Sequence, residues 1–168
     1  MGTLTVQTLQ APTSGANANK VIIPSGQNLI SAGHVIQVVE GTTTTQLAHN
    51  STSYGATSIT ASITPTFTSS KILVSVTSNL ETNSAGEFGW YSIHRDSTNI
   101  AESQIGQSSG TSGSPIFPIC IQKLDAPSTT SAVTYTLYVK RTNATIVANI
   151  NSGGINSLGV ITLQEIAQ

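Results

Sequence analysis

Short runs in which apolar residues alternate with hydroxyl-bearing residues recur along this chain. The clearest are Lys71–Thr77 and Val133–Lys140. A period of two places alternate side chains on opposite sides of an extended backbone, so each run predicts a strand with one buried face. The residues expected to point inward are Ile72, Val74 and Val76 in the first run and Val133, Tyr135, Leu137 and Val139 in the second.

The residues expected on the outward faces carry hydroxyl groups more often than charges. Serine and threonine supply 48 of the 168 residues, whereas Asp, Glu, Lys and Arg together make up 8%; a typical soluble domain carries about 25% charged residues. Such a surface has few groups that polarise a substrate, move a proton or hold a metal. We therefore predict a protein that binds other protein surfaces, without catalysis and without a cofactor. The formal net charge is −1 and the six Lys and Arg residues are scattered, so nucleic-acid binding is not expected.

The region 34–168 reads as a succession of short strands separated by loops rich in Ser, Thr, Gly, Pro and Asn. No stretch shows a convincing helical period. About nine strands at this spacing predict an all-β, antiparallel β-sandwich. Besides the two runs above, the expected strands are His34–Val39, Ser58–Ile63, Phe88–Arg95, Asn99–Ser103, Ile116–Lys123, Ala144–Ile150 and Leu158–Ile166. The expected loops are Gly41–Thr45, Pro65–Ser70, Asn83–Gly86, Gln107–Pro115, Ala126–Ser131 and Asn151–Ser157.

Residues 1–33 have a different character and predict an extended N-terminal arm. Two short strand-like pieces, Thr3–Leu9 and Lys20–Ile23, are separated by a stretch with the composition of turns. Their apolar side chains are too few to form a core, but they suit strand addition to the sheet edge of a neighbour. The predicted partner-binding residues are Leu4, Val6, Leu9, Val21, Ile22 and Ile23. The start of the chain lacks the features of a signal peptide and no apolar run is long enough to span a membrane, so neither export nor membrane insertion is expected.

The motifs that suggest chemistry are weak. Gly106–Gly110 fits the G-x-S-x-G pattern of a nucleophile elbow, but the Thr111–Pro115 continuation cannot supply the helix that the elbow requires. His34, His49 and His94 are not at metal-ligand spacing. Arg95 and Asp96, which follow His94, are expected at a polar strand end that leads into a turn. These patterns predict a structural or binding role.

Cys120 and the adjacent pair Trp90 and Tyr91 carry specific expectations. Cys120 is the only cysteine and lies in the apolar run Ile116–Ile121, so we expect it to be a small buried hydrophobe. Trp90 and Tyr91 are adjacent on a predicted strand, which places one in the core and leaves the other able to face outward. A sugar-stacking platform at the outward ring is the alternative to a purely structural role for this pair.

Five segments of the chain are similar to a known family. They are Gly2–Gln10, Gly33–Val39, Ser62–Val74, Leu124–Pro127 together with the strand that ends in Tyr138–Lys140, and Ile161–Gln168. The combination resembles small virion proteins of tailed bacteriophages, especially those of cyanobacteria and other aquatic bacteria, which serve as capsid cement proteins or tail-fibre modules. The resemblance implies a β-sandwich, often of jelly-roll type, that assembles as a homotrimer on the virion. It carries over no individual functional residue.

The residues and the resemblance together favour a capsid cement or decoration protein. Its expected partners are the major capsid protein and two further copies of itself, and its expected location is the virion, assembled in the host cytoplasm. A tail or head fibre module that binds a receptor on the host surface is the alternative. An esterase or a glycan hydrolase is disfavoured because the chain offers few carboxylates, and only 5% of its residues are aromatic and able to wall a cleft.

Overall fold

The computed structural model describes residues 10–16, 18–20, 30–82, 88–106, 116–142, 148–150 and 157–168. The chain divides into two units, Met1–Ile30 and Ser31–Gln168. The partner-binding residues predicted in the arm lie outside the described residues, as do both of the strand-like pieces predicted there apart from Lys20. They are Leu4, Val6, Leu9, Val21, Ile22 and Ile23.

The second unit is all-β, as predicted, and its described residues contain no helix. All nine predicted strands have a counterpart, although several differ in length. One strand of three residues, too short to show a period, was not predicted. The strands are β1 (Val35–Thr43), β2 (Leu47–His49), β3 (Gly55–Ile63), β4 (Lys71–Thr82), β5 (Phe88–Arg95), β6 (Thr98–Gly106), β7 (Ile116–Asp125), β8 (Val133–Arg141), β9 (Ala148–Ile150) and β10 (Gly159–Ile166).

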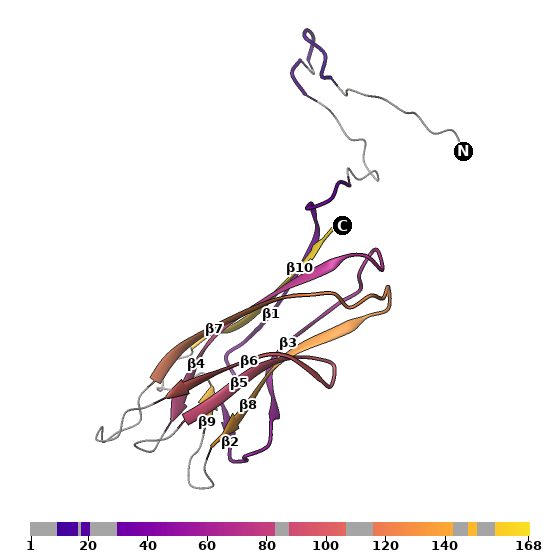
Figure 1. Cartoon of the computed structure of the whole chain (residues 1–168). Helices are drawn as coiled ribbons and strands as arrows, with labels where there is room; N and C mark the ends of the chain where they lie inside the picture. Colours follow the sequence, from indigo (N-terminus) through magenta and orange to yellow (C-terminus); the bar gives the residue numbers. More distant parts are fainter. Residues whose placement is uncertain are drawn as a thin grey trace. The chain divides into compact units, whose positions relative to one another are not determined.

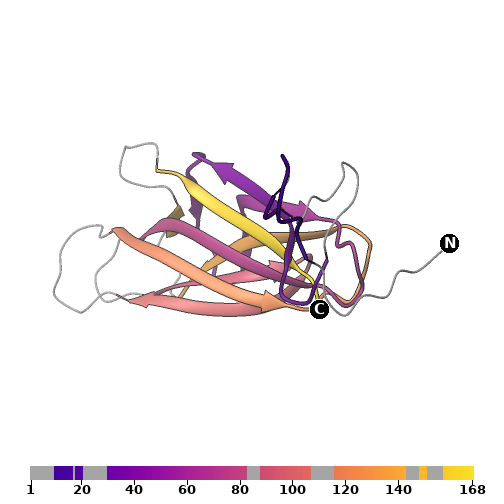
Figure 2. The same cartoon turned by 90° about the horizontal axis from the view of Figure 1, so that it is seen from above.

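The strands form two antiparallel sheets that pack face to face (Figures 1 and 2). In sheet A the main order is β1-β10-β4-β7, and the short strands β9 and β2 continue the sheet beyond β10 along β4. In sheet B the order is β3-β8-β5-β6. Among these eight main strands, only the β5–β6 connection stays within one sheet. This alternation between the sheets is the jelly-roll topology, and the sandwich is thus of the predicted class.

The core lies between the two sheets and consists of the residues that the alternation places inward. Val74 on β4 and Leu137 on β8 are fully buried. All seven residues predicted to point inward in these two strands are buried, because the period of two is fixed by the backbone of each strand. The remaining members of the core come mainly from β3, β5, β7 and β10: Ile59, Ala61, Ile63, Tyr91, Ile93, Ile119, Ile121, Ile161 and Leu163, with Leu80 from β4.

The predicted loop that begins at Gly41 is wrong in its first part, because Gly41 to Thr43 belong to β1. Gly41 pairs with Ile161 and points inward, where sheet A approaches sheet B closely. A Cβ atom at Gly41 would lie 2.0 Å from the backbone oxygen of Thr60 on β3. The glycine therefore permits the close approach of two strands, whereas the residue types of Gly41–Thr45 had suggested a loop.

Candidate interaction surfaces

The outward side of sheet A, which we call face A, is rich in uncharged and apolar side chains. The strand registers define it directly. One row across the four main strands consists of Val38, Gln164, Leu73 and Leu124. Val38 is 58% exposed and Leu124 is 47% exposed. Antiparallel sheets with one solvated face usually show polar residues outward, so these apolar rows are typical of a face that contacts another protein.

Two further rows continue the same pattern. The first contains Glu40, Thr162, Ser75 and Gln122, in which the Gln122 amide donates to the Ser75 hydroxyl at 3.0 Å. The second contains Thr42, Val160, Thr77 and Cys120. Hydroxyl and amide groups separate the apolar side chains, so face A offers both hydrophobic contact and hydrogen bonding.

The prediction for Cys120 is wrong, because its side chain is exposed on face A. The neighbours Ile119 and Ile121 occupy the inward positions of β7, and alternation turns Cys120 outward. The run around Cys120 is apolar on both sides of the strand, which is typical of a strand covered on both faces. This lack of alternation was the signal in the sequence that could have identified face A.

A hollow of about 520 Å³ lies beside Cys120. Pro118 and the exposed Leu158, which precedes β10, also line it. At the outward positions of β1, β10, β4 and β7, the charged residues are Glu40 on the edge strand β1 and Lys71 and Glu81 near the two ends of β4. The middle of face A is therefore uncharged, and a second copy of the same face would meet little electrostatic repulsion.

The outward side of sheet B, which we call face B, differs in composition. Its hydroxyl groups pair across strands: Thr60 with Thr136 and Ser62 with Thr134, each pair at 2.7 Å between oxygen atoms. In each cross-strand pair one hydroxyl group donates a hydrogen bond to the other, and the surface that results is polar. Apart from Ala56 and the ring of Tyr138, the apolar residues of β3 and β8 lie on the inward side, so the alternation in these strands is nearly complete.

The adjacent pair Trp90 and Tyr91 separates as predicted. Tyr91 is 6% exposed and belongs to the core. Trp90 faces outward on β5 and is partly exposed, with Lys140 of β8 and Gln104 of β6 as its register partners. The outward ring is thus on face B.

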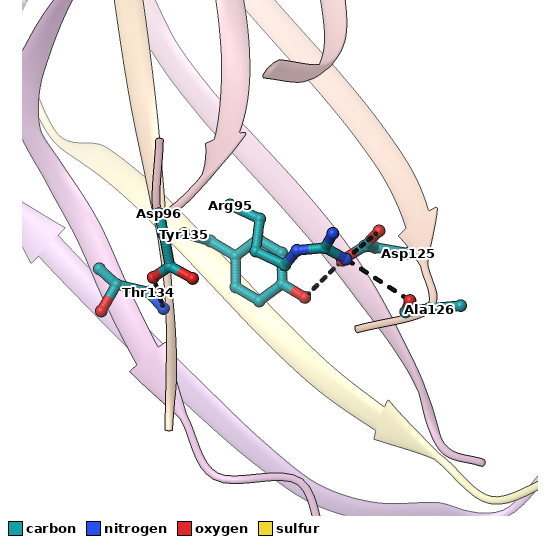
Figure 3. A network of polar contacts seen from close by, with 6 residues as sticks. All are labelled: Arg95, Asp96, Asp125, Ala126, Thr134 and Tyr135. Carbon is teal, nitrogen blue, oxygen red and sulfur yellow. Dashed lines mark hydrogen bonds and ion pairs between the residues drawn. The ribbon is translucent and has the colours of Figure 1, made fainter. Parts of the chain in front are cut away.

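One polar network joins the two sheets at the ends of β5 and β7 (Figure 3). The Arg95 guanidinium donates to both carboxylate oxygens of Asp125, at 3.0 and 2.8 Å, and the Tyr135 hydroxyl donates to the same carboxylate at 2.7 Å. Burial, and then the hydrogen bond to Asp125, raise the pKa of Tyr135. Asp125 thereby holds a charged side chain and a buried phenol in place.

The residue after Arg95 completes the polar turn that the sequence predicted. Asp96 adopts a positive φ of 52° in the two-residue β5–β6 hairpin, a conformation that Asp tolerates better than most residues. Its backbone amide donates to the Thr134 oxygen and its carboxylate accepts from the Thr134 amide, at 2.7 and 3.0 Å. These bonds fix the hairpin to β8.

A buried carboxylate secures the loop between β3 and β4. Glu165 on β10 is fully buried and accepts hydrogen bonds from the Gln37 amide at 2.6 Å and from the Thr66 backbone amide at 2.6 Å. Burial alone would raise the pKa of Glu165. Hydrogen bonding from neighbouring polar groups, including Gln37 and Thr66, outweighs this effect and lowers the pKa below its ordinary value.

The other chemical motifs find no support in the described part of the chain. Most of the G-x-S-x-G stretch, including Ser108, lies outside the described residues. Within those residues, no three His, Cys, Asp or Glu side chains group as a metal site would require. None of the described segments forms a helix long and apolar enough to cross a membrane.

Comparisons with known proteins give no family assignment. No family model matches the chain, and no curated protein matches it. Among solved structures, it is similar to dimeric latent PorU from Porphyromonas gingivalis, with 13% identity and a TM-score of 0.42 over 90% of this chain and 15% of that one. It is also similar to the protein of T=1 particles derived from infectious bursal virus, with 13% identity and a TM-score of 0.38 over 89% of this chain and 41% of that one. At these values the similarities carry no argument about function.

Proposed function

We propose that this chain is a non-enzymatic virion structural protein that assembles as a homotrimer through face A and decorates the outer surface of a phage capsid. The observation that carries the self-association is the uncharged, partly apolar face A, with Val38 and Leu124 exposed in the same row. The phage-like segments of the sequence and the jelly-roll topology support the virion role.

A closed trimer repeats one contact three times around a threefold axis, and side chains near that axis meet their own copies, so a face that lines the axis must tolerate contact with its own kind. Face A meets this condition because the middle of the sheet carries no charge. Contacts between apolar and hydroxyl-bearing side chains are little affected by ionic strength, in contrast to ion pairs at a surface. The proposed trimer should therefore persist at high salt.

Attachment to the capsid is assigned to the N-terminal arm. Its six apolar residues, predicted above, suit strand addition to an exposed sheet edge of the major capsid protein. Each arm alone would bind modestly because ordering an extended segment costs about 1–2 kcal/mol per residue. Three arms on one trimer act together, and avidity raises the overall affinity without a new contact.

Sedimentation of purified protein tests the trimer. The wild type should sediment as a trimer at micromolar concentration in low and in high salt, whereas Leu124→Asp should sediment as a folded monomer. Ala56→Asp is the matched control, because Ala56 is exposed at an outward position of face B. A stable wild-type monomer, or a trimer that only Ala56→Asp dissociates, would contradict self-association through face A.

Reconstitution with undecorated capsids tests the attachment. Removal of residues 1–30 should leave the sandwich folded and trimeric but should abolish binding to the particles. Full occupancy by the truncated protein would show that the arm does not anchor it. Cryo-electron microscopy of purified virions would also separate the two virion roles, because a decoration protein covers the shell in many copies and a fibre module does not.

A further inference from the structure

Face B carries a cluster of aromatic rings that neither the proposed trimer nor the proposed capsid attachment uses. The aromatic cluster consists of Tyr54, Trp90, His94 and Tyr138, together with the side chain of Lys140. Only 5% of the residues are Phe, Trp or Tyr, and Trp90 is the single tryptophan. The two tyrosines of the cluster are those that the core does not take, since Tyr91 and Tyr135 are buried between the sheets.

The ammonium group of Lys140 lies over two of these rings. Its Nζ is 4.3 Å from the ring centroid of Tyr54 and 5.3 Å from that of Trp90, which is the geometry of cation–π contacts. Within the described ranges, the one ion pair is that between Arg95 and Asp125, so Lys140 forms no ion pair with a described carboxylate. The N–H groups of Lys140 remain as donors at the surface.

Hydrogen bonds and stacking hold the cluster in one arrangement. The Tyr54 hydroxyl donates to Glu102 at 3.0 Å, and the Asn99 amide donates to the same oxygen at 3.1 Å. His94 stacks on Tyr138 with ring centroids 3.9 Å apart, and Tyr54 meets His94 edge-on. Burial and the interaction with Glu102 raise the pKa of Tyr54 to about 12, so its hydroxyl stays protonated at neutral pH. Side chains held in this way need little reordering when a ligand binds.

The His94 ring forms the buried base of the cluster. Its exposed fraction is 8%, and its Nε2 atom has no hydrogen-bond partner. Burial lowers its pKa, so the ring is neutral at physiological pH. The aromatic cluster and its neighbours therefore present one cation, Lys140, and one anion, Glu102, and are neutral as a whole.

This combination fits one class of ligand. A pyranose ring has a face of C–H groups that packs on an aromatic ring and an edge of hydroxyl groups that both donate and accept hydrogen bonds. Ligand sites commonly combine aromatic surface with a few placed polar groups. We propose that the aromatic cluster binds a neutral pyranose unit of a surface saccharide, with Trp90 as the stacking platform, Lys140 as donor, and Glu102 and Gln104 as acceptors.

The position of the cluster is compatible with access to a ligand. Residues 31–35 enter the sandwich beside the end of β10, where Val35 pairs with Ile166. Asp125 lies near that entry, because it pairs with Ile72, which pairs with Glu165 beside Ile166. Arg95, the last residue of β5, contacts Asp125, whereas Trp90 is the third residue of β5 and lies toward its other end. The Trp90 side of the cluster is thus in the half of the sandwich away from the entry. It also lies on the opposite sheet from face A, so a saccharide and a second subunit would not compete.

Two measurements on the full chain test this proposal. The first is an array of neutral oligosaccharides of glucose, galactose, mannose and N-acetylglucosamine, with uronic-acid chains for comparison. The second is titration of the wild type with the strongest-binding neutral oligosaccharide while tryptophan emission is recorded, since all of this emission comes from Trp90. We expect saturable binding to neutral chains together with a saturable change in emission.

The variants separate stacking from a loss of folding. Trp90→Ala should weaken binding about tenfold or more, whereas Trp90→Phe should retain most of it because a ring remains. Phe67→Ala, which removes a 39% exposed ring from the loop between β3 and β4, should bind like the wild type. Absence of binding to every oligosaccharide, binding restricted to uronic-acid chains, or full binding by folded Trp90→Ala would each overturn the proposal. A monomeric wild type that still binds the neutral chains would refute only the proposed trimer.

Discussion

Faces A and B are built from antiparallel strands of similar length that cover the same core, yet they leave different groups exposed. Face A exposes Val38 and Leu124 within a row that crosses four strands. Face B pairs its hydroxyl groups across strands and gathers its outward rings around Lys140. Two sheets over one core can therefore differ in their outer faces: face A exposes apolar side chains, which suit the proposed protein contact, and face B carries a localised aromatic cluster, which suits the proposed ligand.

The strongest test of this comparison places a charge on each side of the same strand. Val74→Asp puts a carboxylate into the core and should lower the free energy of unfolding by several kcal/mol, because the buried ion has no partner. Leu137→Asp should do the same from sheet B. Leu73→Asp, one position away on face A, should change the unfolding free energy of the isolated domain by only about 0.5 kcal/mol. Denaturant unfolding of the three variants measures this, and equal stability of Val74→Asp and the wild type would show that the inward assignment is wrong.

A smaller effect is expected where the two sheets are joined. Asp125→Ala removes the acceptor for both Arg95 and Tyr135 and should cost about 2–3 kcal/mol, since the pair is only partly shielded from solvent. Tyr135→Phe removes one hydrogen bond and should cost about 1 kcal/mol. Thermal denaturation compares the two variants. If Asp125→Ala is no less stable than Tyr135→Phe, the ion pair contributes nothing to the joining of the sheets.

The dependence of stability on pH in the acidic range should come from Glu165 on β10 of sheet A. The pKa of Glu165 is lower in the folded protein than in the unfolded chain. Its contribution to stability is therefore complete above the ordinary glutamate pKa and is lost as the pH falls through the folded value. Unfolding measured from neutral to acidic pH should show a decline in stability for the wild type that Glu165→Gln largely lacks. Parallel profiles for both proteins would rule out this carboxylate as the source.

The dependence of stability on pH in the alkaline range should come from Tyr54 on face B. We expect this effect to be the smallest of the four on stability. The pKa of Tyr54 is raised to about 12, above the ordinary tyrosine value of about 10. The stabilising contribution of the neutral phenol is complete below about 10 and is lost as the pH rises toward the folded value. Phenolate absorbance during an alkaline titration should lose a late-titrating group in Tyr54→Phe. Loss of an early-titrating group would contradict the contact with Glu102.

Accessibility of the single thiol sharpens the same comparison without a stability measurement. Cys120 is exposed on face A of the isolated subunit. A maleimide reagent should therefore label the monomeric Leu124→Asp protein quickly and the assembled wild type slowly. Equal labelling rates would mean that the partner subunit does not cover β7. Neither result bears on the assignment of the β-sandwich fold.

The local alternation predicted much of the fold. The inward residues of β4 and β8 were predicted one by one, and the bounds of β5 were predicted at both ends. The short strand β2 was not predicted, since three residues cannot show a period. Cys120 was placed in the core because an apolar run without alternation does not reveal which of its residues face inward. The predicted partner-binding residues of the arm lie outside the described residues and remain a prediction.

Alternation in the sequence was enough to identify the inward side of β4 and β8, because that side depends only on the pleat of a single extended segment. The turn at Asp96 was also predictable, since its chemistry is local. Which strands are neighbours, and therefore which residues share a face, depends on how the two sheets pack. Leu73 and Leu124 meet through the register of β4 with β7, and Tyr54, Trp90 and Lys140 converge from three separate segments. Pairing between segments distant in the chain depends on the packing of the whole core, and no local period encodes it.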